Sequence, residues 1–400
     1  MTDASIAAYA ALAGTLALPL YSYLGYPALL RLLGSTRPSA PTRPPPTRPP
    51  SDLPVVSIVI PVYNEAAVIA ETLEAILCLD YPADRRQILV VSDASTDGTD
   101  DMVARFAARG VELLRQSHRA GKTAAENAAR SRLRGDVVVN TDASVRIHPA
   151  ALKALVAALA APTVGVASGR DVSVDRRDGA ANRGERTYVG YEMWVRDLET
   201  GLGGIVGASG CLYAIRADLH REFVPENLSR DFAAALIARR HGLRAVSVPE
   251  AVCFVPRGAS LRQEYRRKVR TMARGLRTLW HMRALLNPWR YGAFAWMLAS
   301  HKLCRWLVPW CLAGAASALA LLAANGSLWA TASLVAAGIV TLVALVGWTW
   351  PAARPLPRVV ALPAYLVTGA IAALHAWVLA LGGERTAVWE PTRRGEASFS

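Results

Sequence analysis

Three acidic residues follow apolar runs that are typical of buried strands. Glu65 comes after the run at 55–63, Asp93 after the run at 87–92, and Asp142 after the run at 137–140. Each acid taken alone is compatible with a helix cap or an Asx turn. Three acids at one sheet edge favour a binding site, because carboxylates there can hold a divalent cation and hydrogen-bond a ribose or base. This chemistry suits a nucleoside diphosphate ligand.

Lys122 adds a cation in the segment Arg119-Ala120-Gly121-Lys122, where glycine lets the backbone approach a phosphate. The ATPase phosphate loop G-x-x-x-x-G-K-[ST] is incomplete, since Gln116 stands at its first glycine. The glycine cluster at 201–210 also misses the dinucleotide fingerprint, because Val206 occupies the final glycine position. The sequence therefore predicts phosphate binding without ATPase chemistry or a dinucleotide cofactor.

The elements around these residues alternate between strand and helix. Apolar residues at helical spacing predict helices at 66–77, 100–109 and 123–132, and a further strand is predicted at 111–115. Thr99 is the expected N-cap of the second helix. Short strands alternating with helices predict an α/β fold with a doubly wound, mostly parallel sheet. Ligands of such sheets bind at the carboxyl ends of the strands, where the three acids lie.

The composition indicates that part of the chain lies in lipid. Hydrophobic residues make up 52% of it, and the mean hydropathy of +0.23 is high for a soluble protein. The net charge of +14 suits anionic lipid headgroups or a phosphorylated substrate, and we predict no nucleic-acid partner. The five cysteines lack the spacing of a zinc site or a disulfide framework.

The uncharged run at 6–30 is long enough to span a bilayer and favours an uncleaved anchor over a signal peptide. The arginines that follow it place the next domain in the cytoplasm by the positive-inside rule. Three more apolar runs lie at 306–324, 328–350 and 359–381. These crossings would put the basic tail outside, against the charge rule. Either the segment at 288–303 enters the membrane or the tail departs from that rule.

We therefore predict a multi-pass protein of the inner (plasma) membrane with a cytosolic domain. Its expected parts are an N-terminal anchor at 1–36, a proline-rich linker at 37–54, the cytosolic domain at 55–283, an interfacial helix at 284–303, membrane helices at 304–382 and a basic tail at 383–400.

Four motifs follow one another in the cytosolic domain: IVIPVYNEA at 58–66, SDASTDGT at 92–99, RAGKTAAEN at 119–127 and TDAS at 141–144. In this order and spacing they resemble the membrane-bound family 2 glycosyltransferases, which are inverting enzymes with the GT-A fold. The resemblance runs over about residues 55–280. It implies that a nucleotide sugar donor lies against Pro61, Tyr63, Glu65, Asp93, Lys122 and Asp142.

The same resemblance implies where the acceptor and the catalytic base lie. GASGCLYAIR at 207–216, which contains Gly210, resembles the loop that lines the acceptor side, and Asp231 falls at the position of the general base. A carboxylate there takes the acceptor proton while the oxygen attacks the anomeric carbon. Arg266 and Arg267 stand in the place of the Q-x-x-R-W box, where they contact either diphosphate or, as a basic helix face, lipid headgroups.

Three residues depart from the family pattern. The D-x-D motif is reduced to Asp142-Ala143-Ser144, so that Asp142 and Ser144 are the expected ligands of Mn²⁺ or Mg²⁺ and the metal requirement is open. Arg230 stands where an acid usually precedes the base, which can alter acceptor preference. Arg267 replaces the tryptophan of the processive box, so single addition is as well supported as long-chain synthesis.

The predicted function is transfer of a sugar from a nucleoside diphosphate donor, with a UDP-sugar expected, to a lipid-linked or glycan acceptor in cell-envelope or exopolysaccharide synthesis. The alternative is a non-catalytic nucleotide-sugar-binding component of a polysaccharide assembly complex, motivated by Ser144 and Arg230. A transporter is disfavoured, because the three C-terminal apolar runs contain no Asp, Glu, Lys or Arg.

Overall fold

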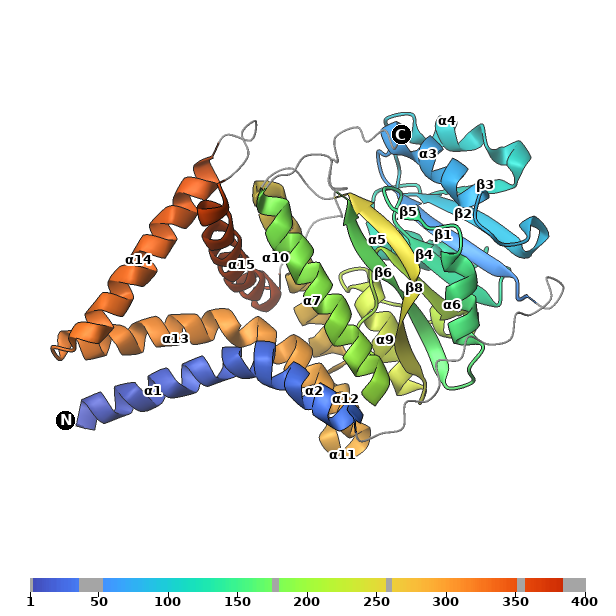
Figure 1. Cartoon of the computed structure of the whole chain (residues 1–400). Coiled ribbons are helices and arrows are strands. Elements are labelled where there is room, and N and C mark those ends of the chain that lie inside the picture. Colours follow the sequence, from blue (N-terminus) through green and yellow to red (C-terminus); the bar gives the residue numbers. More distant parts are fainter. Residues whose placement is uncertain (1–2, 36–52, 175–179, 257–260, 351–356, 384–400) are drawn as a thin grey trace.

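The computed structural model describes residues 3–35, 53–174, 180–256, 261–350 and 357–383 (Figure 1). A domain built on a twisted sheet lies at one end of the molecule, and long helices extend from it (Figure 1). Most of the proline-rich linker predicted at 37–54, and all but the first residue of the basic tail predicted at 383–400, fall outside the described residues.

The sheet has eight strands in the order β3-β2-β1-β4-β7-β6-β8-β5. Their bounds are β1 Val56–Val62, β2 Arg86–Ser92, β3 Val111–Arg115, β4 Val137–Thr141, β5 Arg146–Ile147, β6 Val164–Val174, β7 Leu212–Arg216 and β8 Arg244–Pro256. Strands β3, β2, β1 and β4 are mutually parallel, as predicted for a doubly wound fold. Strand β7 runs antiparallel to both of its neighbours, so the complete sheet is mixed.

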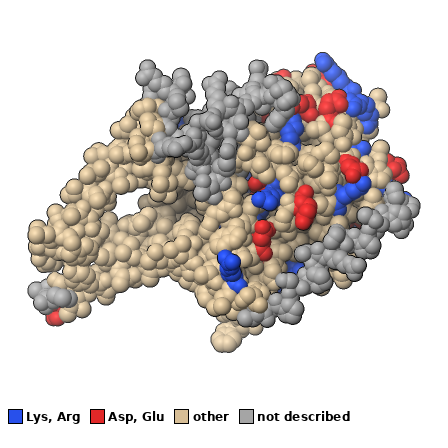
Figure 2. Space-filling view, in the orientation of Figure 1, with Lys and Arg blue, Asp and Glu red and all other residues tan. Residues whose placement is uncertain are grey.

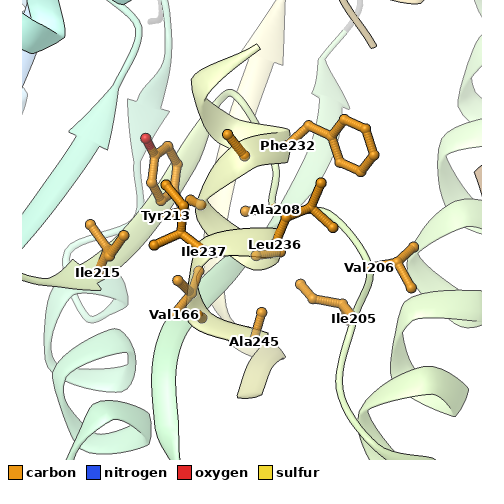
Figure 3. Close-up of a cluster of buried hydrophobic side chains, with 14 of the residues drawn as sticks. Val166, Ile205, Val206, Ala208, Tyr213, Ile215, Phe232, Leu236, Ile237 and Ala245 are labelled. Carbon is orange, nitrogen blue, oxygen red and sulfur yellow. The ribbon is translucent and has the colours of Figure 1, made fainter. Parts of the chain in front are cut away.

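Helices cover both faces of the sheet, which explains the nearly continuous apolar strands. Along β1, Val56, Ile58 and Ile60 belong to one buried cluster and Val59 belongs to the other. The first cluster is closed by α3 (Ala66–Leu77), α4 (Thr99–Ala104) and α6 (Ala151–Leu159). The second includes α5 (Lys122–Ala129) and α9 (Arg230–Arg240), and Figure 3 shows part of it.

The predicted helix at 66–77 matches α3, whereas the other two predicted helices end earlier than expected. The prediction that Thr99 is the N-cap of α4 is wrong. Gly98 caps the helix in the left-handed conformation, with φ +89°, and Thr99 is the first helical residue. The Thr99 hydroxyl is turned toward the loop between β1 and α3, where it accepts a hydrogen bond from the Glu65 amide at 2.9 Å.

Four helical stretches of the described chain are long and apolar enough to cross a bilayer, at 3–35, 293–324, 328–349 and 359–381. The first comprises α1 (Asp3–Leu20), a π-helical turn and α2 (Tyr26–Ser35); the others include α13 (Arg305–Ala324), α14 (Leu328–Thr349) and α15 (Arg358–Leu381). Figure 2 shows mostly uncharged surface over α13, α14 and α15 and an opening between them.

The structure differs from the predicted division into an interfacial helix at 284–303 and a separate first span. After α11 (Pro288–Tyr291), one continuous helix runs from Ala293 through α12 (Ala293–Leu298) and the π-helical turn η6 (Ala299–Cys304) into α13. Gly292, with φ +54°, separates α11 from that helix, and no glycine or proline interrupts it before Pro309. The polar residues His301 and Lys302 therefore lie inside the helix.

A buried polar network joins this helix to the sheet domain. Glu199 of α7 (Ala180–Leu202) is fully buried and accepts hydrogen bonds from the Tyr26 hydroxyl and from His301 Nδ1, both at 2.5 Å. His301 Nε2 lies 2.9 Å from Glu192, which also pairs with Arg305. Burial raises the pKa of Glu199, but the neighbouring His301 outweighs it and holds that pKa below its usual range. The network therefore fixes the first and second membrane stretches to α7.

We predict that Glu199→Leu lowers the midpoint of thermal unfolding of the detergent-purified protein by about 10 °C, because it leaves the Tyr26 hydroxyl and His301 Nδ1 buried without a partner. Tryptophan fluorescence during heating measures this midpoint. Glu74→Leu is the matched control, since Glu74 pairs with Arg109 on the exposed surface, and it is expected to change the midpoint by no more than about 2 °C. Equal midpoints for the two variants would show that the network does not stabilise the junction.

Candidate functional site

The ends of β1 and β2 are tied together by their loops. Asn64 and Ala94, the second residue after each strand, adopt left-handed backbone conformations with φ of 53° and 58°. The Asn64 side chain accepts a hydrogen bond from the Thr96 amide at 2.8 Å. The two left-handed residues turn the chain sharply at the strand ends, and the hydrogen bond holds the two loops together. The predicted donor residues Pro61, Tyr63 and Glu65 thereby lie at the carboxyl edge of the sheet.

Tyr63 stacks against a cation of the third motif, RAGKTAAEN. The Arg119 guanidinium lies 3.9 Å from the centre of the Tyr63 ring, a cation–π distance. The predicted donor residue Tyr63 of the first motif is therefore in direct contact with the third motif.

Asp93 binds the backbone of the third motif, a contact that the sequence does not indicate. It is buried at the end of β2, and its two carboxylate oxygens accept hydrogen bonds from the backbone amides of Ala120 and Gly121, at 2.7 and 2.8 Å. Gly121 has φ +98°, a conformation that side chains rarely adopt, and it immediately precedes α5. Asp93 thus positions the loop that carries Lys122, and its predicted contact with the donor stays a prediction.

Lys122 bridges two segments that are distant in sequence. Its ammonium donates to Asp142 Oδ1 at 2.6 Å and to the carbonyl of Gly210 at 2.9 Å. Burial lowers the pKa of Lys122, but Asp142, Glu126 and Asp231 outweigh it, so the net shift is upward. The side chain is therefore a fixed cation at neutral pH. This bridge joins the end of β4 to the loop before β7.

Asp231 also lies against the loop that contains Gly210. It is in the first turn of α9, where the Ser229 hydroxyl donates a hydrogen bond to its carboxylate. A Cβ atom added to Gly210 would lie only 2.7 Å from Asp231 Oδ2, so the glycine allows the loop to pass against the carboxylate. The structure thereby brings together Lys122, Asp142, Gly210 and Asp231, which the sequence predicted as one site.

The residue before Asp231 does not face this loop. Arg230 is buried and donates to the Asn127 side chain at 2.5 Å and to the backbone carbonyl of His220. It therefore holds α5 and α8 (Ala217–His220) against α9. We assign it a structural role.

The structure also contains two site residues that were not singled out in the sequence, Glu126 and Arg274. Glu126 is buried one helical turn after Lys122, and burial raises its pKa. Arg274 of α10 (Leu261–His281) donates to Thr123 Oγ1 at 2.7 Å and to the carbonyl of Glu226 at 2.9 Å, so it braces the segment before Asp231. Arginines recur at four-residue spacing in α10, at 266, 270 and 274, and this pattern could have indicated one helix face.

Arg266 and Arg267 lie earlier in α10. Arg267 makes a two-point ion pair with Glu264 of its own helix, at 2.8 and 2.9 Å, and Arg266 is exposed. The neighbouring Tyr265 instead contacts α15, since its hydroxyl lies 2.9 Å from His375 Nδ1. Binding of diphosphate by Arg266 and Arg267 stays a prediction.

The residues expected to hold a metal ion supply one carboxylate and one hydroxyl, from Asp142 and Ser144. Lys122 occupies Asp142 Oδ1, and within the described ranges Asp142 Oδ2 has no hydrogen-bond partner. Those ranges contain no group of three or more His, Cys, Asp or Glu that could hold a metal ion unaided. The set fits Mg²⁺ or Mn²⁺ in the manner of sites that use one or two carboxylates and the phosphates of the substrate.

Comparison with known proteins agrees with this geometry. Residues 57–223 match the family model Glycosyl transferase family 2. Among curated proteins, a beta-monoglucosyldiacylglycerol synthase from Nostoc sp. is 28% identical over 157 residues, which are 38% of this chain and 34% of the relative. An N-acetylglucosaminyltransferase from Azorhizobium caulinodans is 26% identical over 237 residues, 53% of this chain and 58% of the relative. The chain thus spans from about a third to somewhat more than half of the length of these relatives.

Among solved structures, the mannosyltransferase PcManGT from Pyrobaculum calidifontis, in complex with GDP-Man and Mn²⁺, is similar over nearly the entire chain. The superposition has a TM-score of 0.72 at 26% identity and covers 95% of this chain and 99% of that protein. The similarity thus extends beyond the sheet domain to the apolar helices and supports the predicted GT-A fold. The motifs, the family model over residues 57–223 and this fold together identify a glycosyl transferase family 2 domain in the chain.

Proposed function

We propose that this protein is a membrane-bound inverting glycosyltransferase that moves a sugar from a nucleoside diphosphate to a lipid-linked or glycan acceptor. The observation that carries the proposal is the loop at Gly210, which accepts a hydrogen bond from Lys122 of the Lys122–Asp142 ion pair and passes against the Asp231 carboxylate. A cation for the diphosphate and a base for the acceptor are thereby held next to one short segment.

In the proposed reaction, Asp231 accepts the proton of the acceptor hydroxyl as the acceptor oxygen attacks the anomeric carbon. The bond from the anomeric carbon to the diphosphate oxygen breaks, and the nucleoside diphosphate leaves with the electron pair. Attack opposite to the leaving group inverts the anomeric centre. The Lys122 ammonium stabilises the negative charge that develops on the diphosphate.

Asp142, with Ser144, is the proposed place for a divalent cation. Such an ion, when bound, neutralises diphosphate charge as a Lewis acid. The mannosyltransferase with a similar fold was determined with GDP-Man and Mn²⁺, which supports including both GDP- and UDP-sugars among the donors to be tested.

The proposed orientation places the sheet domain in the cytoplasm and the four apolar stretches in the plasma membrane. Arginines that follow the first stretch in the sequence support it. A site next to the bilayer raises the local concentration of a lipid-linked acceptor.

We predict that EDTA lowers nucleotide release at least about tenfold and that added Mn²⁺ restores it, because Lys122, whose charge is shared with Asp142, only partly neutralises a diphosphate. In Asp142→Asn, added Mn²⁺ should restore little activity. Nucleotide release from a panel of UDP- and GDP-sugars measures both effects. Release that is equal with and without EDTA would contradict a role for the cation.

We predict that Asp231→Asn lowers kcat by about 10²- to 10⁴-fold, because the amide cannot take the acceptor proton. The affinity for the nucleotide sugar, measured by titration calorimetry, should be unchanged. Asp218→Asn is the matched control, since Asp218 is exposed on α8, and it should retain full activity.

Measuring kcat and donor affinity together also distinguishes the transferase from the alternative, a non-catalytic nucleotide-sugar-binding protein. The incomplete D-x-D motif favours that alternative. A wild-type protein that binds the donor but turns over none of the acceptors would support that alternative. Turnover that survives in Asp231→Asn would contradict the assignment of the base.

A further inference from the structure

One of the four lysines differs from the other three in its surroundings. Lys122 pairs with Asp142, Lys153 with Asp80, and Lys268 with Glu264. Lys302, in the π-helical turn η6, makes no hydrogen bond and no ion pair with any residue that the structure describes. It is only partly exposed. A partly buried ammonium without a direct ion-pair partner costs free energy, which an anionic ligand would offset.

The carboxylates nearest to Lys302 already have partners. Glu192 is bound by His301 and Arg305, and Glu199 is bound by His301 and Tyr26. These two carboxylates face three cations, which are Lys302 itself, Arg305 and the buried Arg196. The junction between the sheet domain and the membrane helices therefore carries an excess of positive charge.

This excess charge lies beside the proposed active site. The Lys302 ammonium is 5.6 Å from the centre of the Phe232 ring, and Phe232 directly follows Asp231. It would also lie 3.7 Å from a Cβ atom added to Gly207, whose carbonyl accepts a hydrogen bond from Arg196 at 2.7 Å. Figure 3 shows Phe232 beside the segment that carries Val206 and Ala208.

Lys302 and Lys122 approach opposite ends of one loop. Lys122 binds the carbonyl of Gly210, whereas Lys302 lies against Gly207, on the helix that continues into α13. Trp306, in the first turn of α13, packs edge-on against Phe232, with ring centres 6.0 Å apart. The diphosphate of the donor is expected at Lys122, whereas Lys302 belongs to the apolar stretch at 293–324, so a membrane lipid is the nearer source of an anion for Lys302.

We propose that Lys302 binds a phosphate group in the headgroup of a lipid acceptor and so places the acceptor beside Asp231. This inference rests on the proposed transferase function and narrows its acceptor to a phosphate-bearing lipid. A lysine ammonium is a common point-charge partner for phosphate, and the adjoining apolar helices offer a surface for the hydrocarbon chains.

Binding of short-chain lipids to the detergent-purified full chain tests this proposal. Dihexanoyl phosphatidate carries the phosphate, and dihexanoylglycerol has the same chains without it. The wild type should bind phosphatidate about 10- to 100-fold more tightly than dihexanoylglycerol, as expected for a charged hydrogen bond. Lys302→Met should lose this preference, Lys302→Arg should keep most of it, and Lys153→Met is the matched control that should keep all of it.

Two further measurements distinguish lipid binding at Lys302 from a structural role and from donor binding. Lys302→Met should unfold at the same temperature as the wild type or higher, because it removes an unpaired charge, whereas loss of a purely structural lysine would lower that temperature. Affinities for UDP and GDP should be the same in all variants. An unchanged lipid preference in Lys302→Met would overturn the proposal. So would a loss of UDP or GDP affinity in that variant, which would place the donor diphosphate at Lys302.

Inorganic phosphate is the remaining competitor. It should bind at least about tenfold more weakly than phosphatidate, because it lacks the chains, and equal affinities would overturn the lipid assignment. The binding measurements need no turnover, so the proposal can fail while Asp231→Asn still supports the transferase, and the reverse also holds.

Discussion

The ion pair between Lys122 and Asp142 is the interaction on which the rest of the site depends. Lys122 stands at the start of α5, Asp142 follows β4, and the Gly210 carbonyl that shares the ammonium precedes β7. The side chains of both ionic partners are about one-fifth exposed. At such partial burial the attraction is less screened than on the surface, yet water and ligand can still reach it. A group that is ordered before the ligand binds loses little entropy when it does.

The mixed sheet supplies the geometry for this pair. Because β7 runs antiparallel to β4, with Thr141 opposite Leu212, the segment that enters β7 lies beside the end of β4. The Thr141 hydroxyl reinforces this arrangement by donating to the Cys211 carbonyl at 2.9 Å. Behind the loop, α9 presents Asp231, and Phe232, Leu236 and Ile237 anchor that helix in the buried cluster. Strand direction, rather than local sequence, therefore determines which residues meet.

Features that depend on local sequence could be predicted, whereas contacts that depend on how strands and helices pack could not. Acids after strands, and strands alternating with helices, are local patterns, so α3 and the first four strands agree with prediction. The grouping of Asp231 with Lys122 and Asp142 is expected only from the family resemblance. The role of Asp93 depends on backbone amides 27 and 28 residues away, which no periodicity encodes. Arg274 and Lys302 reach their positions through packing between helices distant in sequence. Arg230 precedes the predicted base in the sequence, yet the fold directs it toward Asn127.

A double-mutant cycle on Lys122→Met and Asp142→Asn would show whether the two side chains act as one unit in donor binding. The measured quantity is kcat/KM for the nucleotide sugar in the wild type, both single variants and the double variant. We expect a coupling free energy of about 1–3 kcal/mol, with the double variant losing much less than the two single losses combined. Losses that add to within about 0.5 kcal/mol would contradict this expectation, because they would show that Lys122 and Asp142 act independently.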